Sequence, residues 1–348
     1  MKNVTRRDLL KHGAAAFAAV GAEMSLLGRA SAQGKVIKLQ LGTDLPATHP
    51  LNVRLKEAVD AISAETKGRV VISLAANNQL GNDSEMLSHI KSGTLQMAAL
   101  PGVVMSTLIP ETAITSVGFA FSGDDTFSSY DRIWTAMDGG VGDYIRKSIE
   151  KANLKPFDTV FDNGFRQITT TGKPIRTPQD LHNLKLRIPV VPLWESMFKK
   201  LGASTVSVPV SDVYRTLQSK VADAQENPLA VIDSLKLYEV QKYCSLTNHT
   251  WDGFWLVVNG NTWKSLPVDV QGVLEKHINA AANKQRDDIA KANTDLQKKL
   301  EAKGLKFNHV DQAPFRAALK ASGFYTQAER QFGTEAWGLL QTFSGRFG

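Results

Sequence analysis

The sequence has few of the residues that metal and redox chemistry require. It contains one cysteine, Cys244, so neither an internal disulfide nor a cluster of thiolate ligands can form. Its seven histidines are dispersed, and it lacks a His-Glu-x-x-His helix, a Gly-x-Ser-x-Gly turn and a phosphate-binding loop. The composition therefore predicts no metal, no cofactor and no enzymatic activity, and it predicts that Cys244 packs as a small apolar residue.

An excess of charge of one sign is also missing. The chain has 41 basic and 34 acidic residues, a net charge of +7. Residues 1–32 carry five basic and two acidic residues, which leaves 36 basic and 32 acidic residues, a net +4, for the rest. This balance, scattered along the chain, gives no stripe of basic residues, so we predict no nucleic-acid partner.

Long apolar runs are absent as well. The alanine-rich stretch 13–27 is shorter than the ~20 residues that span a bilayer, and Glu23 interrupts it. It follows Thr-Arg-Arg-Asp-Leu-Leu-Lys at 5–11 and precedes Ala-Ser-Ala at 30–32, which offers small residues for signal peptidase. This order predicts a twin-arginine-type signal peptide over 1–32 and export to the periplasm. An amphipathic N-terminal helix is the alternative.

The rest of the chain alternates predicted strands and helices. Its 348 residues suffice for about two domains of ~100–200 residues each. Apolar periodicity predicts strands at 36–41, 70–74, 95–100, 158–161, 166–171, 185–188 and 205–208, and helices at 51–67, 83–91, 178–183, 192–201 and 211–219. The order strand, helix, strand favours an α/β fold with a parallel sheet, and it restarts near residue 158. We therefore predict two α/β domains in tandem.

One long helix is predicted over 267–303. The stretch has proline near its first turn, Gly304 just after its end, and an apolar stripe in which Gln285 is the single polar interruption. A helix of ~36 residues is ~54 Å long, longer than either domain is wide, so it would brace both. A helix broken near Asn283 or a coiled-coil arm are the alternatives.

A candidate anion site centres on Arg187. In the predicted strand 185–188, Lys185 and Arg187 share the polar face, and Pro189 follows at the strand's end. A guanidinium is permanently charged and holds a carboxylate by two parallel hydrogen bonds. Taken alone, however, such an arginine is more often a solvated surface charge.

A set of ordered motifs runs from residue 163 to residue 249. They read Gly-Phe-Arg, Pro-Ile, Asp-Leu, Lys-Leu-Arg, Val-Tyr-x-x-Leu-Gln, Asp-x-Gln-Glu-Asn-Pro, Tyr-Glu-Val-Gln-Lys-Tyr and Leu-Thr-Asn-His. The set resembles the signature of solute-binding proteins that serve TRAP (tripartite ATP-independent periplasmic) transporters. Weaker matches extend to residues 78–81 and 266–267, so the resemblance covers most of the chain after residue 32.

The resemblance implies a two-lobed periplasmic binding protein fold. Lobe I would comprise 33–162 plus about 250–285, and lobe II 163–249 plus about 286–348, with the 267–303 helix bracing both. Arg187 would pair with a ligand carboxylate, Arg166 would add a second charged contact, and Asn227 would complete the clamp. Glu226 would order an arginine or contact the ligand. His49 and Asp83 would lie on loops that face the cleft.

Departures from the family pattern bear on the ligand. Some relatives carry an aromatic wall where this chain has Val210, and relatives that bind sialic acid carry an acidic residue near Pro101 and a polar residue near Val190. Apolar residues here favour a monocarboxylate with an apolar or aromatic body. Four aromatic residues are candidates for the pocket wall, although core packing explains each of them equally well: Trp194, Trp251, Phe254 and Trp255.

The resemblance also implies a mechanism and partners. An anion that contacts both lobes only in the closed state favours hinge closure. The closed form would deliver the carboxylate to the transporter's membrane subunits, and the protein would act as a monomer. One alternative is an ABC-type or sensor-linked binding protein for a C4-dicarboxylate or sugar acid. The other is a periplasmic enzyme, although none of the catalytic motifs named above occurs in the sequence.

Overall fold

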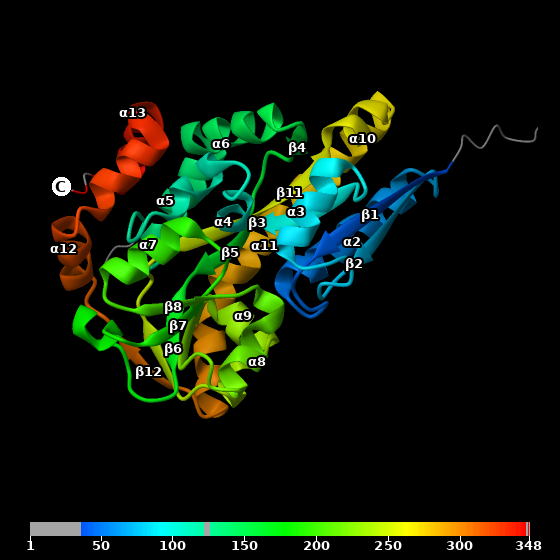
Figure 1. Ribbon diagram of the computed structural model, residues 1–348. Coiled ribbons are helices and arrows are strands. Elements are labelled where there is room, and N and C mark those ends of the chain that lie inside the picture. Colours follow the sequence, from blue (N-terminus) through cyan, green and yellow to red (C-terminus); the bar gives the residue numbers. More distant parts are fainter. Residues whose placement is uncertain (1–35, 122–125, 346, 348) are drawn as a thin grey trace, which may run out of the picture. The chain divides into compact units, whose positions relative to one another are not determined.

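Two mixed β-sheets form the framework of the computed structural model, which describes residues 36–121, 126–345 and 347 (Figure 1). The strands of the first sheet are β1 (Ile37–Thr43), β2 (Val70–Ala75), β3 (Met97–Pro101), β4 (Leu154–Pro156), β5 (Phe161–Phe165) and β11 (Trp251–Asn259). Their order is β2-β1-β3-β11-β4, and β5 also pairs with β11. Both sheets belong to one compact unit, Lys38–Gly348.

The first sheet is not wholly parallel. β1 and β3 pair in parallel, as the strand–helix–strand order predicts, but β11 runs antiparallel to β3, β4 and β5. The prediction of a parallel sheet is therefore wrong for the strands that pair with β11. This strand enters the sheet from a distant part of the chain, which the local strand–helix–strand pattern does not include. The strand predicted at 158–161 lies instead at 161–165, where all five residues are buried.

The second sheet has the order β12-β10-β6-β9-β7-β8. Its strands are β6 (Gln167–Thr170), β7 (Lys185–Ile188), β8 (Ser204–Ser207), β9 (Ala224–Asn227), β10 (Tyr243–Leu246) and β12 (Lys306–His309). The chain passes from the first sheet to the second between Phe165 and Gln167, so that Arg166 lies at the crossing, and it returns between Leu246 and Trp251. The exact division into lobes stays a prediction.

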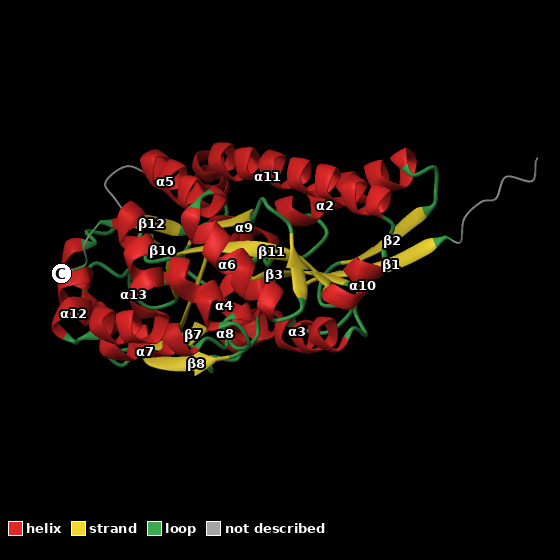
Figure 2. Ribbon diagram, turned by 90° about the horizontal axis from the view of Figure 1, so that it is seen from above, coloured by secondary structure: helices red, strands yellow, loops and turns green. Residues whose placement is uncertain are grey.

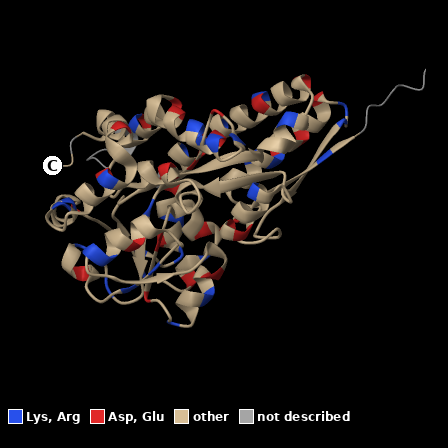
Figure 3. Ribbon diagram, turned by 45° about the horizontal axis from the view of Figure 1, so that its top comes forward, with Lys and Arg blue, Asp and Glu red and all other residues tan. Residues whose placement is uncertain are grey.

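Helices pack against both sheets (Figure 2). They are α2 (Pro50–Glu65), α3 (Asp83–Ser92), α4 (Gly102–Met105), α5 (Thr126–Asp138), α6 (Gly140–Lys151), α7 (Pro192–Lys200), α8 (Val213–Gln218), α9 (Leu229–Ser234), α10 (Gly260–Ser265), α11 (Val268–Ala302), α12 (Ala313–Ala321) and α13 (Phe324–Ser344). Short 3-10 turns are η1 (Pro110–Ser116), η2 (Pro178–Leu181), η3 (Val210–Asp212) and η4 (Leu237–Glu239). The helix predicted at 178–183 is thus only a 3-10 turn. Residues of both charge signs are distributed over the helices (Figure 3).

The predicted long helix is confirmed as one element, α11, of 35 residues. At 1.5 Å per residue it is ~53 Å long. It packs against α2 and β5 on the side of the first sheet and against α9 and β12 on the side of the second. Figure 2 shows α2 alongside it. Through these contacts α11 packs against both halves of the molecule, as the prediction of a bracing helix requires.

The polar interruption in the apolar stripe of α11 has a structural cause. Gln285 is fully buried; its Oε1 accepts from the backbone N–H of Asp162 at 2.8 Å, and its Nε2 donates to the carbonyl of Asp162 at 2.6 Å. The next residue, Arg286, donates from Nε to the carbonyl of Val160 at 2.9 Å. The two side chains pair backbone groups of β5 and the residue before it, so α11 is fastened next to the crossing at Arg166.

Replacing Gln285 with leucine is expected to lower the free energy of unfolding by about 2–5 kcal/mol, because two buried backbone groups lose their partners at about 1–3 kcal/mol each. Urea denaturation of the protein checks this. Gln297→Leu, on a more exposed turn of the same helix, controls for helix propensity and should stay within about 0.5 kcal/mol of wild type. Equal effects of the two substitutions would contradict a fastening role for Gln285.

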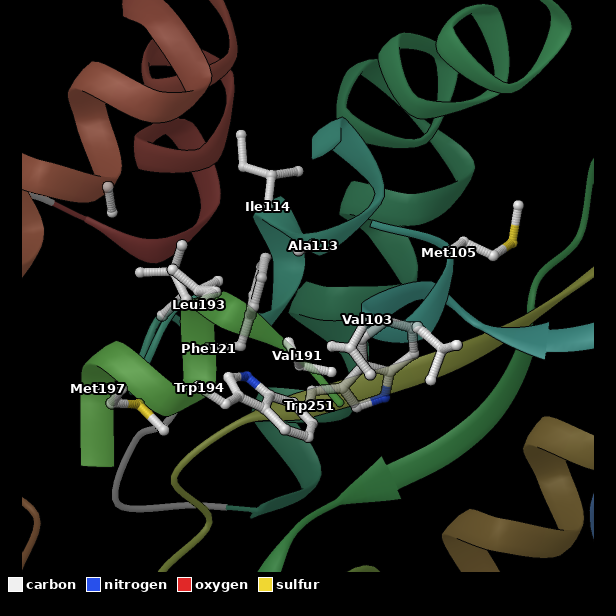
Figure 4. Packing of buried hydrophobic residues seen from close by; sticks show 14 of the residues in the cluster. Val103, Met105, Ala113, Ile114, Phe121, Val191, Leu193, Trp194, Met197 and Trp251 are labelled. Atoms are coloured by element: carbon white, nitrogen blue, oxygen red, sulfur yellow. The ribbon is translucent and has the colours of Figure 1, made fainter. Parts of the chain in front are cut away.

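A large apolar cluster fills the space beside the sheets. Figure 4 shows part of it, with Trp194 and Trp251 packed among side chains such as Val191 and Leu193. Cys244 is fully buried in a second cluster, and burial raises the pKa of its thiol, so it packs as an apolar residue. Within the part of the chain that the structure describes, no helix has the length and apolarity to cross a membrane, and no group of three or more acidic, histidine or cysteine residues is arranged to hold a metal ion.

Candidate functional site

A small cavity lies between the two sheets. Its volume is about 20 Å³, which is room for about one water molecule. The residues that line the cavity on the side of the first sheet form what we call the first-sheet wall. They include Asp44, Asp83, Pro101, Asn163, Asp252 and Phe254. The second-sheet wall includes Arg166, Arg187, Pro189, Val210 and Asn227. An organic acid can enter only if the two walls move apart.

Arg187 is the charged centre of the second-sheet wall. It extends from β7 and is only 1% exposed. Its Nε and Nη2 donate to the carbonyl of Val208 at 3.0 and 2.6 Å. This leaves Nη1 and a second Nη2 hydrogen, the end of the guanidinium that can hold both oxygens of a carboxylate.

No carboxylate of the described residues lies within ion-pair distance of Arg187. Burial lowers the pKa of its guanidinium to about 10, although the negative charge of Glu226 acts in the opposite direction. The side chain therefore stays charged at neutral pH, and it is a buried cation without a counter-ion. Burying an unpaired charge is costly, so this position favours an anion in the cavity.

Arg166 lies at the crossing between the sheets and is held from three sides. Its Nε and Nη2 bind both carboxylate oxygens of Glu226, and Nη2 also donates to Asn227 Oδ1 at 2.9 Å. Its Cζ lies 4.7 Å from the ring centroid of Trp194. Two residues before Arg166, in β5, where the pairing with β11 shifts register, Gly164 has a φ of 106°, which is unfavourable for other residues. Nη1 alone is left to contact a ligand.

Glu226 completes a buried network behind Arg166. It is fully buried and accepts from Nε2 of His249 at 3.2 Å, while Nδ1 of His249 lies 2.8 Å from the hydroxyl of Thr247. Burial would raise the pKa of Glu226, but the charge of Arg166 and hydrogen bonds from His249 and Arg166 lower it below its usual value. Glu226 does not line the cavity; it orders Arg166, the first of the two roles that the sequence leaves open.

The remaining predicted site residues divide into two groups. Asn227, Val210 and Asp83 line the cavity with the two arginines. His49 and Val190 do not line it. His49 is fully buried as the N-cap of α2, where Nδ1 accepts from the N–H of Leu51 at 3.2 Å, and burial lowers its pKa to about 3. Val190 is 42% exposed.

Of the four aromatic candidates, only Phe254 lines the cavity. Trp194 lies over Arg166 and donates from Nε1 to the carbonyl of Ser116 at 3.0 Å. Trp251 donates from Nε1 to Asp162 at 2.9 Å. Trp255 is buried in the core. These three residues support the walls, so the core-packing alternative describes them correctly.

The first-sheet wall contains acidic residues that were not predicted. Asp44 follows β1, and Asp252 lies in β11; with Asp83 and Asn163 they are at least 94% buried. One side-chain oxygen of each of the four has no hydrogen-bond partner among the described residues. Asp44 stands just beyond the carboxyl end of a predicted parallel strand, where ligands bind in open α/β sheets, and this signal was available in the sequence.

Burial raises the pKa values of three acidic groups on this wall. Burial raises the pKa of Asp252 to about 7, although the charge of Arg166 lowers it in part. Burial likewise raises the pKa of Asp83 to about 6, and burial together with the negative charge of Asp83 raises that of Asp44 well above its usual value. Asp83 reaches the wall because Asn82 caps α3, accepting from the N–H groups of Ser84 and Glu85.

The chain is similar to a known protein family and to several known proteins. A family model described as bacterial extracellular solute-binding protein, family 7, matches residues 41–328. A solute-binding protein of Roseobacter denitrificans is 32% identical over 310 residues, which cover 88% of this chain and 91% of that protein. The 2,3-diketo-L-gulonate-binding periplasmic protein of Escherichia coli is 30% identical over 282 residues, covering 81% and 84%.

A solved structure of similar fold also matches this chain. The crystal structure of a TRAP periplasmic solute-binding protein from Roseobacter denitrificans with bound L-galactonate has a TM-score of 0.79 and 28% identity, and the match covers 89% of this chain and 99% of that one. The family consists of periplasmic proteins that bind small organic acids and are not enzymes. From the match over 41–328 and the two-lobed fold, we conclude that this chain belongs to the TRAP transporter solute-binding proteins.

Proposed function

We propose that this protein captures an organic acid with one carboxylate and a hydroxylated body, of the sugar-acid class, and delivers it to the membrane subunits of a TRAP transporter. The observation that supports this most is the pairing of opposite walls. A buried Arg187 without a carboxylate partner among the described residues faces a wall of unpartnered oxygen acceptors.

The end of the ligand that meets the second-sheet wall is anionic. Arg187 offers two N–H groups and Arg166 offers Nη1, so a carboxylate can receive charge-assisted hydrogen bonds from both. Asn227 bridges Arg166 and Gln225, with Oδ1 accepting at 2.9 Å and Nδ2 donating at 2.6 Å, and thereby holds the clamp in place. Burial of the carboxylate is favourable here because it removes the unpaired charge of Arg187.

The body of the ligand meets the first-sheet wall. Its side-chain oxygens are acceptors, and each acceptor left unpaired costs about 1–3 kcal/mol. Hydroxyl groups of a ligand satisfy such acceptors, and an alkyl or aromatic body does not. We therefore revise the preference for an apolar body, although Phe254 and Pro101 still offer apolar contacts for the carbon chain.

One carboxylate fits this cavity better than two. The cavity is lined by two arginines, both on the second-sheet wall, and the opposite wall carries three aspartates. A second carboxylate of a C4-dicarboxylate would meet these like charges with no cation to compensate. The sugar acids named for two relatives, L-galactonate and 2,3-diketo-L-gulonate, support the same class of ligand.

Capture would proceed by hinge closure. The cavity of about 20 Å³ is far smaller than a sugar acid, so the walls separate to admit the ligand and close when it contacts both. We further propose that the protein acts as a monomer and is exported by the twin-arginine-type signal. Residues 1–32 lie outside the described residues. The family match does not favour the ABC-type and sensor-linked alternatives.

Thermal unfolding of residues 33–348 with three six-carbon acids tests the ligand class. D-galactonate has one carboxylate and hydroxyl groups, hexanoate has one carboxylate without them, and adipate has two carboxylates. A ligand at 100 times its dissociation constant stabilises the native state by about 2.7 kcal/mol. We expect a shift with galactonate alone. A larger rise of the unfolding midpoint with hexanoate than with galactonate would favour a ligand with an apolar body. A larger rise with adipate would favour a dicarboxylate ligand.

A further inference from the structure

Asp44 and Asp83 form a pair of carboxyl groups on the first-sheet wall. Asp44 comes from the loop after β1, and Asp83 from the first turn of α3. They are 3% and 6% exposed and both line the cavity, and burial, the charge of Asp83 and a hydrogen bond with its side chain raise the pKa of Asp44. Oδ1 of each residue has no hydrogen-bond partner among the described residues.

Two carboxylates in contact cannot form a hydrogen bond unless one of them carries a proton. Without that proton, two negative charges would be buried side by side, which raises the proton affinity of the pair, as in other carboxyl dyads. One proton shared between them would satisfy one oxygen of each group, and the pair would then carry about one negative charge.

Charged groups around the pair come from several elements. Asp252 on β11 adds a negative charge next to Asp44, and Arg166 partly compensates Asp252. His49, on the loop that follows Asp44, is buried and neutral. The cation that acts on the pair is Arg187 from the opposite wall, whose charge lowers the pKa of Asp83.

Two further acidic residues act on Arg187 and not on the pair. Glu226, which is bound to Arg166, and Asp212 of η3 both raise the pKa of the Arg187 guanidinium. Neither lies on the first-sheet wall. Arg187 and the carboxyl pair therefore face each other across the cavity, and an anion that binds between them changes the electrostatic interaction of one with the other.

We propose that Asp44 and Asp83 bind the ligand as one proton-sharing pair, so that capture of the anion is coupled to proton uptake. The inference deepens the proposed function and rests on it. A ligand carboxylate on Arg187 neutralises the cation that favours ionisation of Asp83. It also brings a new negative charge into the cavity. Both changes raise the proton affinity of the pair in the complex.

Linkage sets the direction of the pH dependence. If the complex holds its proton more tightly than the free protein, affinity falls as pH rises above the pKa of the free pair, by up to about tenfold per pH unit for one proton. Burial and the neighbouring charges place the pKa of Asp83 in the free protein at about 6. We therefore expect constant affinity below pH 6 and falling affinity from pH 6 to 8.

The ligand-free protein gives the first test, which does not depend on the proposed function. The pKa values of the pair are raised above the unfolded value of about 3.9. The stability that the proton supplies is therefore present at low pH and is lost as pH rises through the folded-state values, between about pH 4 and 7. The unfolding midpoint of Asp44→Asn should fall less over this range than that of wild type. Asp162 and Asp252 titrate in both proteins, so the difference isolates the pair.

Calorimetry with galactonate gives the second test. Titrations at pH 6, 7 and 8 in two buffers of different ionisation enthalpy count the protons taken up. We expect uptake approaching one proton in wild type and a clearly smaller uptake in Asp44→Asn, in which Asp252, with a pKa of about 7, still titrates on the same wall. Asp252→Asn is the matched control and should keep the uptake.

Each outcome has one meaning. Loss of uptake in Asp252→Asn with retention in Asp44→Asn would assign the proton to Asp252 and overturn the proposal. Equal pH dependence of the midpoints of wild type and Asp44→Asn would show that no proton is shared. If none of the panel acids binds, the proposed ligand class fails, and the ligand-free test still decides whether the pair shares a proton.

Discussion

Replacing Arg187 with lysine is expected to weaken binding of the carboxylate ligand by at least about tenfold. Lysine keeps the charge but loses the planar fork, and one charge-assisted hydrogen bond is worth about 1.5–3 kcal/mol, where 1.4 kcal/mol is tenfold in affinity. The effect should be large because Arg187 is buried and is already oriented by the carbonyl of Val208. Isothermal titration with the acid that stabilises the protein most measures the change.

Lys185 offers a matched control for this experiment. It lies on the same strand, two residues earlier, but its side chain is exposed. Lys185→Met changes the net charge of the protein by one unit and should leave the affinity within about twofold, because exposed charges are screened. If Arg187→Lys binds as tightly as wild type while its fold is intact, the assignment of Arg187 as the carboxylate clamp fails.

Replacing Glu226 with glutamine is expected to lower the free energy of unfolding by about 3–5 kcal/mol, the cost of leaving one partner of a buried ion pair uncompensated. Arg166 would keep its charge, 4% exposed, without a carboxylate. Urea denaturation measures this loss. A ligand carboxylate at Nη1 of Arg166 would supply part of the missing charge, so the ligand should stabilise the variant more than wild type.

Glu195→Gln separates this effect from a general loss of charge. Glu195 pairs with Lys199 on the surface of α7 at 2.6 Å, and such exposed pairs contribute about 0–1 kcal/mol. If Glu226→Gln is no less stable than Glu195→Gln, the network of Glu226, Arg166 and His249 does not hold the site together. A purely structural role for Glu226 would lower stability without the larger gain on ligand binding.

The two arginines differ in their partners, and this difference explains the expected effects of Arg187→Lys and Glu226→Gln. Arg166 is neutralised by Glu226, lies against Trp194 and keeps one donor nitrogen free, so it serves as a fixed part of the wall. Arg187 has no carboxylate partner among the described residues, and we propose that it is the group that a ligand neutralises. In this proposal anion selectivity follows from Arg187, and the geometry of the clamp follows from Arg166 and its partners.

Much of the second-sheet wall could be predicted before the structure was known. Arg166, Arg187, Asn227 and Val210 all line the cavity, but their grouping came from the family resemblance. Spacing alone left Arg187 as one more surface charge. The resemblance placed His49 on a loop that faces the cleft and singled out Val190 as a departure from relatives, but it did not fix which way either side chain turns. In the structure His49 caps a helix and Val190 is exposed.

Of the acidic residues on the first-sheet wall, only Asp83 was predicted, from the family resemblance. Asp44 and Asp252 lie far apart in the sequence, and the position of Asp44 after a predicted strand was the one signal available for them. Their properties come from burial and from one another, since an isolated aspartate in water is ionised at neutral pH. This is why the sequence favoured an apolar ligand body, whereas the assembled wall is rich in acceptors.

The sequence by itself determined the local elements of this protein. Apolar periodicity suffices for most strands and for α11, because each depends on contacts between neighbouring residues and on one buried face. The tertiary structure alone decided that β11 joins the first sheet antiparallel, that Gln285 bonds to the backbone of β5, and that Asp44 and Asp83 line one cavity. Those features depend on groups brought together from distant parts of the chain, and the free energy of a buried charge is set by its neighbours in space.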